Sequence, residues 1–280
     1  MIPNKSGDEK DLAFRARRRV ALGRLRLQLA LSRRAISDEL AGAAAVTFVR
    51  SHGNVGDQLI EEGIRFLMGR RPYDEISGAA LGDARGDLAF VAGGGAWCQP
   101  YHEFMPELLP ELEARFRRVV ILPSSFDANV TAVRRALSET KAVVFARERD
   151  SYEAIRSLCD ARLAHDCAFY FDFSSHRRRG LGVLNAFRTD PESRLAASAI
   201  GVPAGNRDIS SELSSLDAWL AAIGQAEVVR TDRAHVMIAG AMLGKRVEAL
   251  PSSYHKVPAI ASHSLRGFSV RLLSDGEVRG

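Results

Sequence analysis

Cationic and proton-exchanging side chains gather in two short polar segments near the carboxyl end of the sequence. The first contains Arg233 and His235, and the second ends in His255 and Lys256. Arginine and lysine bind carboxylates and phosphates, and histidine exchanges protons near neutral pH. These residue types suit an anionic substrate and a reaction in which a proton moves.

The pattern around these segments predicts a strand, a helix and a second strand. A short apolar run precedes Thr231, an apolar stretch continues to Leu243, and a glycine and another apolar run follow. Both polar segments then lie at the carboxyl ends of strands, where open α/β sheets bind ligands. We expect Asp232 to cap the helix, which puts Arg233 at its first position and His235 in its first turn. A cation there opposes the helix dipole, so this corner indicates an anion-binding site.

A glycine-rich corner in the first half of the chain predicts a different kind of site. Residues 45–49 form a candidate buried strand, Asn54, Gly56 and Asp57 follow, and a helix is expected from about residue 58. The corner matches neither the dinucleotide-binding fingerprint nor the P-loop. Carboxylates near the helix start disfavour a phosphate and suit a hydroxyl-rich ligand such as a sugar. The alternative is that the glycines only form the turn and Asp57 caps the helix.

The other strands expected in this half also end in polar or glycine-rich corners. These corners hold Gly94 and Gly95, then Ser124, then Arg147, and Asp166 closes this half. The carboxyl ends of parallel strands meet at one edge of a sheet. We therefore expect a cleft lined by these residues.

Strands and helices alternate along both halves of the chain. This rhythm predicts an α/β protein with two doubly wound Rossmann-like domains facing across a cleft. The polar segment 174–180 separates them, so we expect a basic helical arm at 1–40 and domains at 41–175 and 176–280.

The formal net charge of +5 is unevenly distributed. Residues 1–34 hold ten basic and three acidic residues, so the rest of the chain is close to neutral. The apolar positions of this arm fall on two sides of a helical wheel, one with Leu22, Leu25 and Leu29 and the other with Val20, Leu27 and Leu31. The arm either packs on a domain or rests on an anionic membrane surface. Nucleic acid is not expected, because no aromatic interleaving or known module supports it.

Three cysteines, Cys98, Cys159 and Cys167, are widely spaced and lie beside apolar positions. We expect free thiols in a reducing compartment, and neither a metal nor a disulfide. The sequence has no apolar signal segment and no run of about 18 apolar residues. A cytoplasmic location is therefore expected.

Seven short motifs together resemble a known family. They are Gly53–Asp57, Gly93–Gly95, Leu122–Ser125, Arg147–Glu148 with Ser151, Asp166–Phe169, Thr231–His235 and Leu250–Lys256. In this order the chain resembles the polysaccharide pyruvyl transferases, especially the members from bacterial exopolysaccharide clusters. Ala234 and Cys167 stand where the family commonly has Leu and Pro, which changes packing or backbone rather than chemistry.

This resemblance implies a fold similar to the two-domain GT-B glycosyltransferases. It also implies phosphoenolpyruvate as donor, without another cofactor, and a pyruvate ketal on a sugar as product. Around phosphoenolpyruvate it places Arg147, Arg233 and His235, and we add His255 and Lys256 as further contacts. The phosphoenolpyruvate side is then the second domain and the acceptor side the first.

His235, supported by Arg233, is the expected acid/base, with His255 as a second candidate or a phosphate contact. Asp57 or Asp166 is expected to orient or deprotonate the sugar hydroxyls. The predicted acceptor site contains Asn54, Gly56, Asp57, Gly94, Gly95, Ser124 and Asp166.

Two other functions remain open at this stage. One is a GT-B glycosyltransferase that uses a nucleotide sugar, and the other is a non-catalytic member of an exopolysaccharide assembly complex. A lipid-linked oligosaccharide acceptor at the inner face of the cytoplasmic membrane would give the basic arm a use. Deleting the arm should then reduce membrane association and leave activity on soluble acceptors intact.

Overall fold

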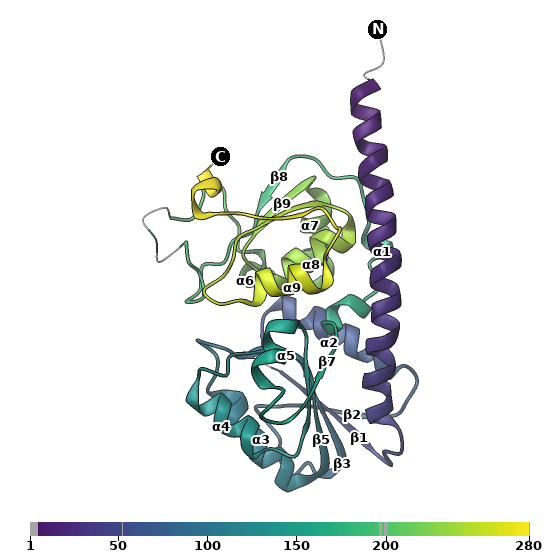
Figure 1. Cartoon of the computed structure of the whole chain (residues 1–280), viewed down its shortest axis with the longest axis vertical. Coiled ribbons are helices and arrows are strands. Elements are labelled where there is room, and N and C mark those ends of the chain that lie inside the picture. Colours follow the sequence, from purple (N-terminus) through teal and green to yellow (C-terminus); the bar gives the residue numbers. More distant parts are fainter. Residues whose placement is uncertain (1–4, 52, 196–197, 199–200, 280) are drawn as a thin grey trace.

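Two parallel β-sheets, each flanked by helices, form two α/β domains, and one long helix runs alongside both (Figure 1). The computed structural model describes residues 5–51, 53–195, 198 and 201–279. The fold class predicted from the alternation of strands and helices is confirmed.

The first sheet has the strand order β2-β1-β3-β5-β6-β7, and β4 pairs with β5. Its strands are β1 (Val46–Arg50), β2 (Asp74–Ser77), β3 (Gly86–Val91), β4 (Gly94–Trp97), β5 (Phe116–Phe126), β6 (Val143–Ala146) and β7 (Asp160–Leu163). Phe48 and Phe90 are paired in register on adjacent strands and are fully buried. Side chains buried on both faces are typical of a parallel sheet covered by helices. All these strands are parallel, so their polar corners meet at one edge.

The helices of the first domain are α2 (Val55–Met68), α3 (Phe104–Arg115), α4 (Thr131–Glu139) and α5 (Arg149–Ile155), followed by the 3₁₀ turns η1 (Cys167–Tyr170) and η2 (Ser174–His176). The expected start of α2 at residue 58 is wrong. Asn54 is the N-cap and accepts the N–H of Gly56, while Asp57 accepts the N–H of Asn54. This reciprocal capping box pairs two N–H groups that a helix start leaves free, which explains both side chains locally.

The second sheet has the order β11-β10-β9-β8 and is also parallel. Its strands are β8 (Val183–Asn185), β9 (Val228–Thr231), β10 (Arg246–Ala249) and β11 (Val270–Leu272). The helices here are α6 (Ile209–Glu212), α7 (Leu216–Gln225), α8 (Ala234–Leu243) and α9 (Lys256–Ser264), with the 3₁₀ turn η3 (Asp275–Arg279) at the end. The predicted strand, helix, strand unit is confirmed as β9-α8-β10. Gly244 ends α8 in the left-handed region at φ 86°, which glycine adopts without strain.

The long helix α1 (Lys5–Leu40) packs against both domains. Leu25 and Ile36 are buried in a core that both domains share. Arg18 donates to the carbonyl of Met242 in the second domain at 2.8 Å, and Ser32 accepts the N–H of His165 in the first at 3.2 Å. Residues 16–40 are therefore part of the folded body, so we expect deletion of the arm to destabilise both domains as well. Residues 1–4 lie outside the described part of the chain.

The apolar core of the described residues has three clusters. The first lies between α1, α2, the first sheet and the helices of the second domain, and the second lies under α3 and α4 on the opposite face of the first sheet. The third is small and surrounds Phe187 and Leu250 in the second domain. The predicted boundary at 174–180 lies between the two sheets, and its position stays a prediction. None of the described helices combines the length and the apolar character needed to cross a bilayer.

Candidate functional site

A pocket of about 740 Å³ lies between the two domains, at the carboxyl ends of strands from both sheets. The first domain contributes the corners after β1, β3, β5 and β6. The second contributes the corner after β9, the segment before α9 and residues of the long connection from β8 to α6. The predicted site residues that line it are Asn54, Asp57, Gly94, Gly95, Ser124, Arg147, Arg233, His235 and Lys256. Residues up to 202 positions apart in the sequence, Asn54 and Lys256, are thus brought together as expected from the sheet edges.

Three predicted site residues lie beside or behind the pocket lining. A Cβ added to Gly56 would lie 3.0 Å from Nδ1 of His235, so this glycine lets the histidine approach α2. Asp166 is fully buried behind Arg147. His255 turns its Nε2 to Ser151 Oγ at 3.1 Å and to Glu148 Oε1 at 3.4 Å. Direct contact with substrate is therefore better supported for His235 than for His255.

The start of α8 differs from the prediction by one residue. Arg233 is the N-cap residue, with an extended backbone, and its N–H is accepted by Thr231 Oγ1 at 3.0 Å. Asp232 does not cap the helix, because its Oδ1 accepts the N–H of Arg188 at 2.8 Å. Burial raises the pKa of Asp232 to about 6 despite that hydrogen bond. His235 lies in the first turn, as expected.

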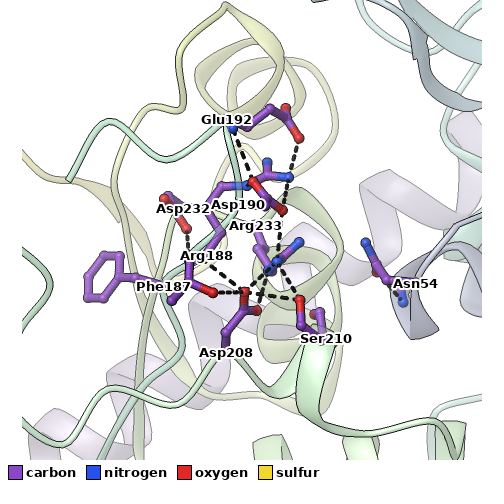
Figure 2. A network of polar contacts seen from close by, with 12 residues as sticks. Asn54, Phe187, Arg188, Asp190, Glu192, Asp208, Ser210, Asp232 and Arg233 are labelled. Atoms are coloured by element: carbon purple, nitrogen blue, oxygen red, sulfur yellow. Dashed lines mark hydrogen bonds and ion pairs between the residues drawn. The ribbon is translucent and has the colours of Figure 1, made fainter. Parts of the chain in front are cut away.

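Two carboxylates hold the guanidinium of Arg233 in place (Figure 2). Its Nε and Nη2 donate to the two oxygens of Asp208, each at 2.6 Å, and Nη2 also reaches Asp190 at 3.0 Å. Asp208 is in turn fixed by the N–H of Thr189 at 3.0 Å. Within the described part of the chain, Nη1 of Arg233 has no hydrogen-bond partner. The carboxylates therefore orient the group and leave one amino group for a ligand.

The segment 188–192, which follows β8, adds acidic and basic side chains to the site that were not predicted from the sequence. Arg188 donates to both oxygens of Asp190, at 2.6 and 2.9 Å, and also pairs with Glu192. Glu192 pairs with the buried ammonium of Lys256 as well. Burial lowers the pKa of Lys256 to about 8, although Glu192 works against this shift. Among the cations of this pocket, Lys256 therefore loses its charge at the lowest pH.

Arg147, Asp166 and His235 link the two domains below the pocket. Arg147 is fully buried, with Nε donating to Ser125 Oγ at 2.8 Å and Nη1 to Asp166 Oδ2 at 2.9 Å. Nε2 of His235 lies 3.5 Å from the same oxygen of Asp166. Burial alone would raise the pKa of Asp166, but His235 and the charge of Arg147 outweigh it and lower the pKa to about 2. This permanent carboxylate orients the guanidinium by a hydrogen bond, whereas Nε2 of His235 is buried beside it without a hydrogen-bond partner in the described structure.

Tyr254 is a pocket residue that sequence reasoning missed. Its hydroxyl is buried and has no hydrogen-bond partner among the described residues. A Cβ on Gly95 would lie 2.8 Å from this hydroxyl, so the glycine makes room for it. Burial raises the pKa of Tyr254 well above its ordinary value, which keeps the phenol protonated. An unpaired buried hydroxyl is costly, so this one indicates a ligand contact.

Each of the four buried cations around the pocket is paired with at least one carboxylate in the described structure. The cations are Arg147, Arg188, Arg233 and Lys256, and the carboxylates are Asp166, Asp190, Glu192 and Asp208. A ligand can gain binding energy from the N–H groups that these pairs leave free. Nη2 of Arg147, 3.9 Å from a Cβ built on Gly95, is one such group and Nη1 of Arg233 is another. Over the residues described, no set of His, Cys, Asp and Glu side chains is arranged to hold a metal.

Comparison with known proteins supports the architecture and places the chain in a family. A functionally uncharacterised protein from Klebsiella pneumoniae has a similar fold, with a TM-score of 0.70 and 22% identity over 88% of this chain and 98% of that chain. ADP-heptose lipopolysaccharide heptosyltransferase II of E. coli gives a TM-score of 0.31 and 14% identity over 82% of this chain and 90% of that chain. This TM-score is too low to indicate a shared fold. No curated protein matches this chain. The family model of the polysaccharide pyruvyl transferases matches residues 38–254, well over half of the sequence, and the chain therefore belongs to this family.

Proposed function

We propose that this protein transfers pyruvate from phosphoenolpyruvate to a sugar of an exopolysaccharide, or of its lipid-linked repeat unit, as a ketal. Phosphate is released. Family membership supports a pyruvyl transferase in general. The observation that carries the specific proposal is that Arg147, Arg233, His235 and Lys256 line one pocket together with Asn54, Asp57 and glycines.

The donor site is the cationic side of the pocket. Phosphoenolpyruvate carries a carboxylate and a phosphate, so it needs cations on more than one wall. The free amino groups of Arg147 and Arg233 come from different domains, and Lys256 adds a third cation. Charge-assisted hydrogen bonds of this kind are about twice as strong as neutral ones. The carboxylates behind the cations prearrange them, so little order is lost when the ligand binds.

The chemistry requires one proton donor and a path for two hydroxyl protons. The methylene carbon of phosphoenolpyruvate gains a proton, and one sugar hydroxyl attacks the neighbouring carbon. The bond from that carbon to the phosphate oxygen then breaks, and a second hydroxyl attacks the same carbon to close the ketal. One of the two hydroxyl protons replaces the proton given to the methylene carbon, and the other leaves with phosphate. His235 serves as the acid/base, since it lines the pocket and its Nε2 lies 3.5 Å from the carboxylate of Asp166.

The acceptor site is the part of the pocket formed by the corner after β1 and the glycines after β3. Oδ2 of Asp57 is engaged in the capping box, while Oδ1 lies 3.8 Å from a Cβ built on Gly94 and faces the pocket. Asn54 uses its side-chain oxygen for the cap, which leaves its amide nitrogen to donate. A carboxylate acceptor and an amide donor side by side suit a pair of sugar hydroxyls. Ser124 and Gly95 complete this part of the pocket.

The test combines phosphate release with mass analysis of the product. The protein is incubated with phosphoenolpyruvate and a panel of soluble and lipid-linked oligosaccharides. We expect phosphate release that depends on the acceptor, and a product heavier by one pyruvate ketal. His235→Asn should reduce kcat by about 100-fold or more, as loss of a general acid/base does. His176→Asn, which lies outside the pocket, is the matched control and should keep full activity.

Arg233 needs a conservative variant, because complete removal would leave the buried Asp208 unpaired. Such a loss costs about 3–5 kcal/mol and can unfold the protein. Arg233→Lys should stay folded by circular dichroism and raise the KM for phosphoenolpyruvate. Turnover that depends on a nucleotide sugar would assign a glycosyltransferase instead. Phosphoenolpyruvate binding without turnover of any acceptor would assign a non-catalytic role in an assembly complex.

The proposal includes a place of action, the inner face of the cytoplasmic membrane. Lipid-linked acceptors reside at a membrane surface, and the protein has no membrane-crossing helix among its described residues.

A further inference from the structure

The helix α1 has two apolar sides, and only one of them is covered by the protein. Leu25 is 2% exposed and faces the core. On the other side, Val20, Leu27 and Leu31 are 74%, 73% and 72% exposed, although they belong to a well-packed helix. At about 100° per residue their spacing places all three within about 60° of one another on the helix circumference. They form one continuous apolar stripe, which we call the outer stripe.

Arginines border the outer stripe on both sides. Exposed arginines between residues 16 and 34 are Arg17, Arg19, Arg24, Arg26, Arg33 and Arg34. No acidic residue occurs in this interval. Within the described structure, none of the six forms an ion pair with a carboxylate. Arg33 instead lies over the ring of Phe66 on α2, 5.4 Å from its centroid, and Phe66 is 52% exposed. At about 100° per residue Arg33 points away from Leu31, so this contact belongs to the packing of α1 on the first domain rather than to the outer stripe.

We propose that the outer stripe and its arginines form a docking surface for an anionic lipid bilayer. Apolar side chains along the middle of a helix can enter the boundary between headgroups and acyl chains. Long arginine side chains on both sides can extend to the lipid phosphates while their methylene groups cover the apolar stripe. Each arginine near an anionic surface contributes about 1 kcal/mol. The inference concerns where the protein works and does not depend on which reaction it catalyses.

Charge decides between this occupant and a second copy of the chain. Two copies joined through the outer stripe would place arginines against arginines, with no carboxylate in the interval to offset them. Like charges in contact oppose such a dimer. A nucleic acid would satisfy the arginines but would leave three large apolar side chains against a polar backbone. An anionic bilayer alone among these three matches both the stripe and its borders.

The packing of α1 makes this surface available without refolding. Arg18 and Ser32 tie the inner side to the second and the first domain, respectively. The outer stripe thus stays in the folded protein as a fixed, straight strip. Docking through the outer stripe also explains why the apolar positions of this helix lie on two opposite sides, since one side packs in the core and the other contacts the bilayer.

Co-sedimentation of the full chain with lipid vesicles tests the proposal. Vesicles of phosphatidylcholine with phosphatidylglycerol should pellet the protein, and vesicles of phosphatidylcholine alone should not. Binding should weaken as salt is raised, because salt screens exposed charges over about 10 Å at 0.1 M. The variants Leu27→Glu with Leu31→Glu, and Arg24→Gln with Arg26→Gln, should each weaken vesicle binding about tenfold or more.

Matched controls come from other exposed positions of the same kinds. Leu181→Glu changes a leucine that is 79% exposed near β8, and Arg135→Gln changes an exposed arginine on α4. Both should keep the binding of the unmodified protein, and all variants should keep its melting temperature within a few degrees. Pyruvyl transfer to a soluble acceptor, measured in parallel, should not change, so failure of the docking surface is distinguishable from failure of the proposed reaction.

Three results would overturn the proposal. The first is no binding to phosphatidylglycerol vesicles at low salt. The second is binding that the outer-stripe variants leave intact or that Leu181→Glu reduces equally. The third is a concentration-dependent dimer, seen by light scattering, that Leu27→Glu with Leu31→Glu abolishes, which would assign the surface to a second copy of the chain.

Discussion

Lys256 gives the donor site a dependence on pH that arginines alone would not give. Burial lowers its pKa to about 8, and pairing with Glu192 offsets only part of this effect. The ammonium is therefore present below pH 8 and lost above it. Phosphoenolpyruvate is already fully ionised within a pH unit on either side of pH 8, because phosphate monoesters lose their second proton near pH 6.

We expect the KM for phosphoenolpyruvate to rise above pH 8, by up to about tenfold per pH unit, with a smaller change in kcat. Lys256→Arg keeps the charge at every accessible pH and should remove the inflection. Lys256→Met should show a high KM at all pH values. Initial rates against phosphoenolpyruvate concentration, measured on both sides of pH 8, decide the matter. An unchanged inflection in Lys256→Arg would assign the titration to another group.

The unpaired hydroxyl of Tyr254 predicts opposite effects on stability and activity. Tyr254→Phe removes a buried polar group without a partner, so stability should stay the same or rise by up to about 1–3 kcal/mol. Activity should fall, since Tyr254 lines the pocket. Tyr170→Phe is the control, because that hydroxyl donates to the carbonyl of Leu29 at 3.2 Å. It should lose about 1 kcal/mol of stability and keep activity. Urea unfolding and steady-state kinetics measure both, and loss of stability in Tyr254→Phe would contradict the interpretation.

Residue types and strand corners predicted the cations of the site but not the groups that hold them. Arg147 and Arg233 follow recognisable strands, so their positions could be inferred from the sheet edges. Asp190 and Asp208 lie in an irregular connection from β8 to α6, where no periodicity indicates direction. Their pairing with Arg233 spans 43 and 25 positions and arises only when the chain folds.

At the scale of elements, the contact between α2 and η1 depends on a glycine. A Cβ on Gly63 would lie 1.8 Å from the carbonyl oxygen of Cys167, a backbone atom that cannot turn away. This close approach holds the Asp166 segment against α2. Gly63→Ala should therefore destabilise the protein by about 1–3 kcal/mol or more, as overpacking does.

Gly23→Ala is the matched control, because a Cβ there meets nothing within 4 Å in the described structure. It should stabilise α1 by up to about 1 kcal/mol through helix propensity. Urea unfolding of both variants compares the two helical glycines directly. Equal destabilisation by both changes would show that close packing at Gly63 is not the cause.

In the first sheet, the strongly apolar strands were predicted from the sequence, and the edge strands β2 and β7 were not. β1, β3, β5 and β6 are apolar runs buried between helices, so composition alone indicates them. β2 and β7 are four residues long, lie at the edges of the first sheet and contain charged, half-exposed residues. Such strands form because a neighbour offers hydrogen bonds, which is a property of the sheet rather than of the segment.

At the scale of the whole molecule, two domains meet over a pocket to which both contribute cations. Arg147 comes from the first domain, and Arg233 and Lys256 come from the second. The two-domain α/β architecture followed from the alternation of elements. The role of α1 did not, because its apolar positions on two sides gave no single direction. In the structure one apolar side of α1 packs on both domains, and the other side is exposed.

The length of α1 has a geometric consequence for the acceptor. Its 36 residues span about 54 Å at 1.5 Å per residue, and the helix touches both domains. With its outer stripe on a bilayer, such a rod sets both domains at one height, and the pocket between them is held at a constant distance from the headgroups. A lipid-linked glycan would then have to be long enough to span the distance from the headgroups to the pocket. The length of the acceptor glycan, as well as the identity of its sugars, then determines which sugar residue receives the ketal.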